Sequence, residues 1–299
     1  MSHSATADPV LLARGEAAFQ AQRRQRRMAS LFGLAVLAAL LLLAARVSEF
    51  YPSSLVAGLP RVGEYFYKLL PSLRWDALFA GTGTEGSIAF WFYRLDDWAW
   101  LLLQTSQMAA LATLAGAAVA LLLAFPAARN LAHSRWSNIL TRRGLEAART
   151  VPEIVYALIF VWAFGIGPLA GILAIFFHTA GALGKLFAEV IENTEMKSWE
   201  GLRASGANWP QACRYAILPQ VMPNLISYAL LRFEINVRGA SVIGFVGAGG
   251  IGQELNLVIS SNYYEEISAI VVLIVLAVFV IDMISEKLRH RVTGAAEGQ

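Results

Sequence analysis

The segment EGLRASGANWPQACRYAILP, Glu200 to Pro219, is polar and rich in turn-forming residues, although the chain on either side of it is strongly apolar. Trp199 to Ser205 is predicted to form a short helix that ends at Gly206, because glycine readily adopts the left-handed conformation found at helix C-termini. A second short helix is expected to follow directly. Two helices meeting at a glycine would form a compact knob, and an ordinary amphipathic loop is the alternative that the local pattern leaves open.

The second helix has a capping signature. Asn208 is placed as the N-cap, Pro210 falls in the first turn, and Gln211 follows Asn208 by three residues as the partner of a capping box. Proline lacks the amide hydrogen that a helix interior needs, so this second helix is predicted to end before Pro219.

The composition of the whole chain is that of an integral membrane protein. Of its 299 residues 57% are hydrophobic and 15% charged, with a mean hydropathy of +0.54, and several apolar runs are long enough to cross a bilayer. One cysteine, Cys213, excludes an internal disulfide, and four widely separated histidines provide no metal-binding spacing. We therefore expect no metal, no cofactor and, since the basic residues flank apolar runs, no nucleic acid.

The basic clusters beside the apolar runs predict an all-α, polytopic fold with six transmembrane helices and both termini in the cytoplasm. A cleavable signal peptide is disfavoured, because a long tail precedes the first run and Arg46 follows it. The predicted segments are a basic tail (1–27), a first membrane helix (28–46), an extracytoplasmic or interfacial segment (47–97), a transmembrane domain (98–288) with a cytoplasmic loop (192–220), and a cytoplasmic tail (289–299). Within the domain, the expected spans are 98–125, 152–164, 169–190, 223–246 and 267–284. The arginine-rich segment 129–149 is expected to be a cytoplasmic loop, and 247–264 is expected to turn at the outer face.

The fifth span contains the charged residues Arg232, Glu234 and Arg238, with Asn236 among them. A charge inside a bilayer is costly, so these side chains should face protein or water. Glu234 and Arg238 are four residues apart in the order that favours a helical ion pair. Arg232 lies on another face of the helix, where it either assists an anion along a translocation path or clamps neighbouring helices.

Small residues elsewhere in the spans have structural interpretations. Thr113 to Ala120 predicts tight helix packing. On the fourth span, His178 and Lys185 either line a path or, as we expect, are a hydrogen-bonded core histidine and a snorkelling lysine. The letters of Gly247 to Gly252 match G-x-G-x-x-G, but no strand precedes them, which argues against a dinucleotide site. Gly247, Gly249, Gly250 and Gly252 instead predict a bend at the outer end of the fifth span, acting as a gate or as a packing turn.

Residues 200–219 resemble the cytoplasmic loop of bacterial ABC importer permeases, whose pattern is E-A-A, three residues, G, nine residues, I, one residue, L-P. Glu200, Gly206 and Leu218-Pro219 are in register, whereas Gly201, Leu202 and Ala216 depart from the pattern. RFEINVR (232–238) and GFVGAGGIG (244–252) are similar to the permease subunit of phosphonate importers. The resemblance covers roughly residues 101–288.

The resemblance implies a coupling element, comprising Glu200, Arg203, Gly206, Ala207 and Pro219, that docks on a separate cytoplasmic ABC ATPase. It also implies two ATPase subunits, a second copy of this chain and an extracytoplasmic substrate-binding protein that delivers phosphonate, phosphite or hypophosphite. The chain has no phosphate loop, because its one Gly-Lys pair, Gly184-Lys185, lacks the required neighbours. It is therefore expected to be a transport subunit and not an enzyme, and the resemblance implies that it lies in the cell inner (plasma) membrane. A permease for methionine or another small solute, a membrane-embedded enzyme and a passive channel are the alternatives.

Overall fold

The computed structural model describes residues 9–297, with side chains described for residues 18–292. This described part is helical with connecting turns and contains no β-strand, so the predicted all-α class is confirmed. The chain divides into two compact units between Tyr67 and Lys68, and each has its own architecture.

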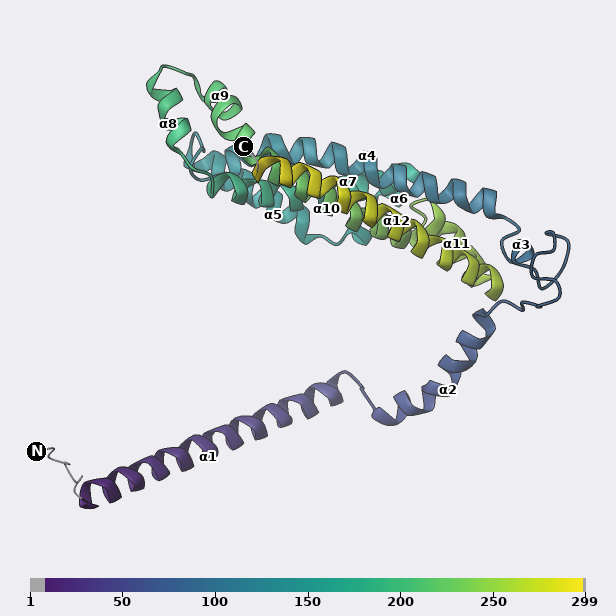
Figure 1. Cartoon of the computed structure of the whole chain (residues 1–299), viewed down its shortest axis with the longest axis horizontal. Helices are drawn as coiled ribbons and strands as arrows, with labels where there is room; N and C mark the ends of the chain where they lie inside the picture. Colours follow the sequence, from purple (N-terminus) through teal and green to yellow (C-terminus); the bar gives the residue numbers. More distant parts are fainter. Residues whose placement is uncertain (1–8, 298–299) are drawn as a thin grey trace, which may run out of the picture. The chain divides into compact units, whose positions relative to one another are not determined.

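The first unit consists of two helices, α1 (Pro9–Val47) and α2 (Pro52–Leu69), the second of which ends just beyond the division. The predicted first span, 28–46, lies inside α1, which is drawn as one continuous helix in purple (Figure 1). Its apolar part is long enough to cross a membrane. The arginines at 23–27 belong to the same helix and extend it beyond the apolar run. Helix α2 is amphipathic, with apolar residues at 55, 59, 62 and 66.

The second unit is a helical bundle. Its elements are α3 (Ile88–Trp91), α4 (Leu95–Ala127), α5 (Arg135–Thr150), α6 (Glu153–Phe164), α7 (Pro168–Glu192), α8 (Lys197–Ala204), α9 (Trp209–Ala212), the π-helical turn η1 (Cys213–Ile217), α10 (Leu218–Ile243), the 3-10 turn η2 (Gly244–Val246), α11 (Ile251–Ser260) and α12 (Tyr264–Glu297). Helices α4, α7, α10 and α12 run lengthwise through it, and α8 and α9 project at one end (Figure 1).

Close packing of α4 on α7 depends on small residues. A Cβ atom on Gly116 would lie 2.9 Å from the methyl carbon of Thr179, and Ala109, Ala112 and Ala174 are fully buried nearby. The prediction of tight packing over Thr113 to Ala120 is therefore confirmed.

Four of the described helices are long and apolar enough to cross a membrane, or up to six spans result if each of two bent helix pairs counts as one. Helices α4, α7 and α12 coincide with the predicted spans 98–125, 169–190 and 267–284.

The third predicted span, 152–164, coincides with helix α6, which reaches the length of a span only when it is counted together with α5. Helix α6 has 12 residues, or about 18 Å of length, which is less than the roughly 30 Å of a bilayer core. The arginine-rich segment before it, expected to be a loop, is mostly helix α5, which begins at the N-cap Ser134 and meets α6 at an angle of 85°. Pro152 explains the break, because proline disfavours helical geometry in the residue before it.

The predicted outer turn between Gly247 and Tyr264 is also wrong, because most of it forms the ten-residue helix α11. This helix buries Ile251 and Val258 in a core shared with Trp98 and Ile270. The segment folds back against the bundle because its apolar residues recur with helical period.

Candidate functional site

The polar segment 197–212 forms the two predicted helices, α8 and α9, joined at Gly206. Gly206 has a φ of +90°, and the Ala207 amide donates to the Leu202 carbonyl at 3.0 Å, which closes the end of α8. The capping box of α9 is present in both directions between Asn208 and Gln211. The local predictions for both helices and their elbow are confirmed, with α8 starting two residues earlier than expected.

Pro219 does not end the second helix, which corrects the prediction. Helix α9 continues through the π-turn η1 into α10, where Pro219 occupies the first turn. The Leu218 amide bonds the Cys213 carbonyl, five residues back. The wider π-turn accommodates a residue that has no amide hydrogen. Trp209 to Ile243 is therefore a nearly continuous helical rod that joins the projecting segment to the bundle.

The two-helix segment is exposed on its outer side and anchored on its inner side. Glu200 and Arg203 are exposed, and Arg203 Nη1 donates to the Ala207 carbonyl at 2.8 Å, bracing the elbow. Trp209 is the anchor, since its Nε1 donates to the Leu131 carbonyl at 2.8 Å just beyond α4. Its ring also packs edge-on against Phe125. Sequence reasoning missed Trp209, although a tryptophan within a polar segment was an available signal.

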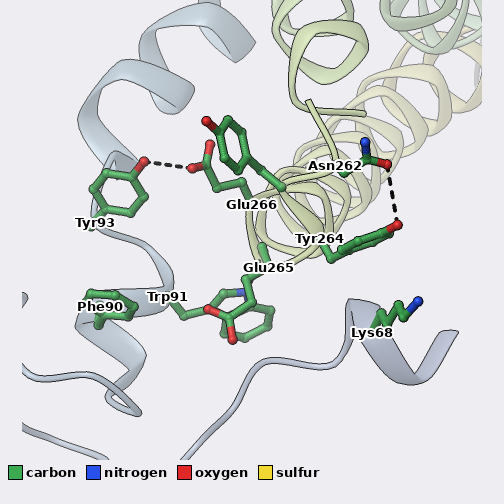
Figure 2. A pocket seen from close by; sticks show the side chains of 9 residues that line it. Lys68, Phe90, Trp91, Tyr93, Asn262, Tyr264, Glu265 and Glu266 are labelled. Atoms are coloured by element: carbon green, nitrogen blue, oxygen red, sulfur yellow. Dashed lines mark hydrogen bonds between the residues drawn. The ribbon is translucent and has the colours of Figure 1, made fainter. Parts of the chain in front are cut away.

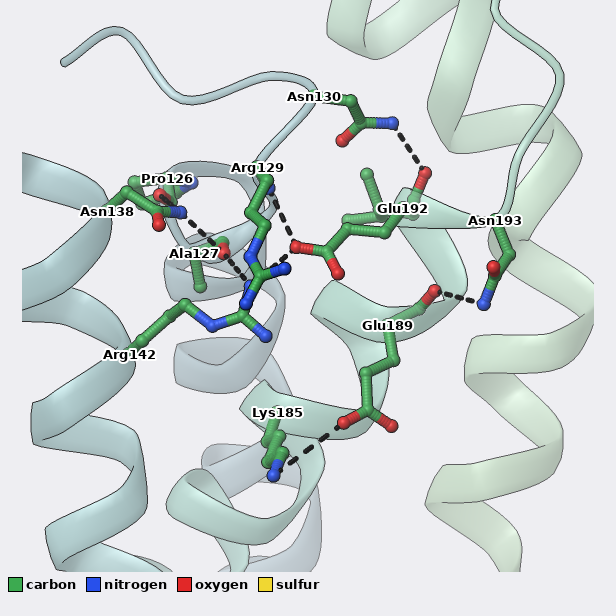
Figure 3. A network of polar contacts seen from close by, with 11 residues as sticks. Pro126, Ala127, Arg129, Asn130, Asn138, Arg142, Lys185, Glu189, Glu192 and Asn193 are labelled. Atoms are coloured by element: carbon green, nitrogen blue, oxygen red, sulfur yellow. Dashed lines mark hydrogen bonds and ion pairs between the residues drawn. The ribbon is translucent and has the colours of Figure 1, made fainter. Parts of the chain in front are cut away.

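A polar network secures the ends of α4, α5 and α7 beside this segment (Figure 3). Glu192, at the end of α7, accepts from Arg142 Nη1 at 2.6 Å and from the Arg129 amide at 2.8 Å. Lys185 lies 3.8 Å from Glu189 one turn earlier. Because Arg142 belongs to α5 and Glu192 to α7, this network ties the two helices together where the segment 193–212 leaves the bundle.

The charges of α10 have partners on other helices. Arg232 Nη2 donates to Glu153 Oε1 at 2.5 Å, Arg238 Nη2 to Asp282 Oδ2 at 2.8 Å, and Glu234 Oε1 lies 3.8 Å from Arg289 Nη1. The predicted pair between Glu234 and Arg238 is therefore wrong. Helix α12 packs along α10 and provides Arg289 as the partner of Glu234 and Asp282 as the partner of Arg238. Spacing within α10 alone does not predict these partners.

This arrangement yields a testable prediction for Arg238. Arg238→Gln should lower the amount of folded protein recovered from membranes several-fold, because it leaves the Asp282 carboxylate without its partner in a candidate membrane span, where an unpaired charge is costly. Adding Asp282→Asn should restore part of the loss. Detergent-solubilised yield measured by size-exclusion chromatography checks this. Rescue by Glu234→Gln in place of Asp282→Asn would contradict the observed pairing.

Asn236 is fully buried next to these charges. Its Nδ2 donates to Thr113 at 2.8 Å and to Thr179 at 2.9 Å, so one amide connects α10 to both α4 and α7. His178 Nδ1 lies 3.1 Å from the Val151 carbonyl, as expected of a hydrogen-bonded core histidine. Glu153 was missed by sequence reasoning, although an acid at the start of an apolar run was a usable signal.

The glycine segment makes a tight bend. Gly247, Gly249 and Gly250 have φ values of +86°, +84° and +72°, a region that disfavours side chains. The Gly167 amide donates to the Gly247 carbonyl at 2.9 Å. A Cβ on Gly252 would collide with the carbonyl of Ser241. The predicted bend is confirmed, and its role as a gate stays a prediction.

The opposite end of the bundle from α8 and α9 has an aromatic and acidic pocket of about 640 Å³ (Figure 2). Tyr93 donates to Glu266 at 2.9 Å, Ser72 Oγ to Glu265 at 2.7 Å, and Trp91 Nε1 to the Glu265 carbonyl at 3.1 Å. Burial, followed by the bond to Glu266, raises the pKa of Tyr93. These bonds hold the segment before α4 against the start of α12.

Together, a multi-pass helical bundle, an exposed two-helix element continuous with one of its helices, and charges paired between helices define the membrane component of a transporter. The chain belongs to the family of binding-protein-dependent transport system inner membrane components, whose family model matches residues 116–293.

Comparisons with individual proteins agree with this family. The phosphite transport system permease protein of Stutzerimonas stutzeri is 40% identical over 193 residues, which cover 64% of this chain and 70% of the relative. Two solved structures share the fold. An inward-facing methionine ABC transporter has a TM-score of 0.55 at 21% identity, covering 65% of this chain and 95% of that one. A bacterial alginate importer has a TM-score of 0.57 at 15% identity, covering 86% and 96%.

Proposed function

We propose that this chain is the permease subunit of an ATP-driven importer for phosphonate or the related oxyanions phosphite and hypophosphite. It works with a cytoplasmic ABC ATPase and an extracytoplasmic binding protein, and it pairs with a second copy of itself, so that two coupling elements meet two ATPase subunits. The observation that carries the coupling role is the continuous rod from Trp209 to Ile243, which links an exposed element to the charged centre of the bundle.

In this mechanism the ATPase engages Glu200, Arg203, Gly206 and Ala207, whose segment is exposed. Closure of the ATPase pair on nucleotide moves α8 and α9 as one body, since the elbow is braced by the Arg203 bond to the Ala207 carbonyl. The rod passes the displacement to α10, with Pro219 at its first turn. The Trp209 bond to Leu131 passes it to the end of α4, and the Arg142 to Glu192 pair carries it on to α5 and α7.

The substrate class rests on the phosphite permease relative and on the RFEINVR and GFVGAGGIG segments. The likeness to the methionine transporter is one of fold, at 21% identity, and does not favour methionine. Because the chain belongs to a transport family, we do not need an enzyme or a passive channel to account for its features. The candidate residues of the path are Arg232, Glu234, Asn236 and Arg238, with Gly247, Gly249, Gly250 and Gly252 at a gate.

The function is tested by uptake of radiolabelled methylphosphonate and phosphite in cells that express the chain with its ATPase and binding protein. We expect ATP-dependent uptake that unlabelled phosphite reduces and unlabelled methionine does not. The ATPase should also co-purify with the permease. Uptake that methionine competes away, or a permease that purifies without any ATPase, would refute the proposal.

The same proposal sets the topology, with 1–27 and 289–299 in the cytoplasm, 28–46 as the first span, 47–97 outside or interfacial, and 192–220 as the coupling loop of the 98–288 domain. Cysteine labelling checks it, because Ser198 and Thr82 are exposed and the single native cysteine, Cys213, is buried. In intact cells an impermeant maleimide should modify Thr82→Cys and spare Ser198→Cys until the membrane is permeabilised. The opposite accessibility would invert the topology.

A further inference from the structure

Glu153 stands at a break in the helical path of the chain. It is the first residue of α6, directly after Pro152, at the 85° bend between α5 and α6. The far end of α6, where the glycine turn at Gly165 follows, is about 18 Å away. With that turn at the membrane surface, Glu153 lies inside a bilayer core of about 30 Å. Broken backbone at such depth is tolerated where it is covered by protein or lines a watery path. Discontinuous helices accordingly mark the substrate sites of many transporters.

The Glu153 carboxylate is held by groups from two other helices, α7 and α10. Its Oε1 accepts from Arg232 Nη2 of α10 at 2.5 Å and lies 4.0 Å from His178 Nε2 of α7. Its Oε2 faces Gly239, where a Cβ would lie 2.8 Å from that oxygen. Arg232 Nε is 3.5 Å from the Thr179 hydroxyl. Because Gly239 has no side chain, the Glu153 carboxylate fits against its Cα and is held in one position beside Arg232.

Arg232 is the cation of this cluster, and its side chain is 13% exposed, against 18% for Glu153. A guanidinium in a membrane interior needs an anion, because an unpaired charge there is costly. The same planar fork of donors that binds a carboxylate also binds a phosphate-like oxyanion. Glu153 and a transported oxyanion therefore bind the same guanidinium, that of Arg232, and exclude each other from it.

We propose that Glu153 is an internal competitor that occupies Arg232 between transport cycles and is displaced when a tetrahedral oxyanion passes. This inference rests on the proposed function. The carboxylate neutralises Arg232 in the empty path and keeps the oxyanion from being held too tightly, so that the anion leaves on the far side. Glu153 thus sets how tightly the path holds an oxyanion. A purely structural clamp between α6 and α10 would not compete with a ligand.

The two interpretations differ in the sign of one measurement. The permease is purified with its ATPase in lipid nanodiscs, without nucleotide or binding protein, and equilibrium binding of radiolabelled methylphosphonate is measured. Competition predicts that Glu153→Gln raises the affinity about tenfold or more, while Arg232→Gln abolishes binding. The double variant Glu153→Gln with Arg232→Gln should recover the yield of the complex and still not bind. A clamp predicts no gain for Glu153→Gln, and an affinity equal to or below wild type overturns the proposal.

Two further arms keep the test decisive. If Glu153→Gln fails to assemble, Glu153→Asp replaces it, since the shorter side chain weakens the contact with Arg232 without removing the charge, and the absence of any gain in affinity overturns the proposal. Wild-type uptake is measured in parallel. If cells take up no methylphosphonate, the proposed function fails. In that case the same binding series is repeated with radiolabelled sulfate, which tests the competition at Arg232 separately from the substrate. Tighter sulfate binding by Glu153→Gln that is lost when Arg232 is also replaced supports the competition. Equal affinities of Glu153→Gln and wild type for sulfate refute it.

Discussion

Gly252→Ala should leave almost no folded permease in the membrane. The added Cβ would meet the carbonyl oxygen and carbon of Ser241 and the Cα of Gly244, all of which are backbone atoms that no side-chain rotation moves away. Relief requires α11 to separate from the end of α10, and overpacking of this kind costs about 3 kcal/mol or more. The measurement is the yield of monodisperse protein after solubilisation.

Gly201→Ala is the matched control for Gly252→Ala. A Cβ there meets nothing within 4 Å, and alanine is the better helix former, so this variant should express at least as well as wild type. Equal yields for the two variants would show that α11 does not pack on α10 as described.

Gly206→Val should separate assembly from transport. The residue has a φ of +90° with open space around it, so the obstacle is backbone conformation and not a clash. A left-handed conformation costs a non-glycine residue roughly 1–2 kcal/mol, and a branched side chain more. The elbow should relax to another geometry and misdirect Glu200 and Arg203. We expect a normal amount of permease in the membrane with uptake per molecule reduced about tenfold, in proportion to such a free-energy cost.

Gly206→Asn is the control for that experiment, because asparagine tolerates positive φ better than valine does. It should retain most of the uptake. ATPase co-purification measured on the same samples locates the defect at docking. Wild-type uptake by Gly206→Val would count against the assignment of residues 197–212 as the coupling element.

Local chemistry predicted much of the fold and part of the site. Apolar runs predicted α1, α4, α7 and α12, because an apolar run of that length with few charges is compatible with few structures other than a membrane-spanning helix. The Gly206 elbow and the Asn208 to Gln211 capping box were predictable since each depends on residues within one turn of one another. The family followed from the motif of residues 200–219, and the chain belongs to it.

Local reasoning failed where a residue's environment comes from elsewhere in the chain. Residues 247–264 were predicted as an outer turn, whereas packing against α4 and α12 makes Ile251–Ser260 a helix. Pro219 was predicted as a stop, but the π-turn before it absorbs the missing hydrogen bond. Tertiary contacts override local preference at α11, and a local change of helix type does so at Pro219.

By itself, therefore, the sequence determined that this is a multi-pass helical membrane protein with a two-helix element of the importer-permease type, because span length, charge flanks and caps act over short distances along the chain. Only the tertiary structure decided the partners of the charges on α10. Arg232 meets Glu153 across 79 positions and Arg238 meets Asp282 across 44, in place of a neighbour on the same helix. In a membrane interior each charge pairs with whichever opposite charge the packing of helices brings within reach, and helix packing is a property of the whole bundle.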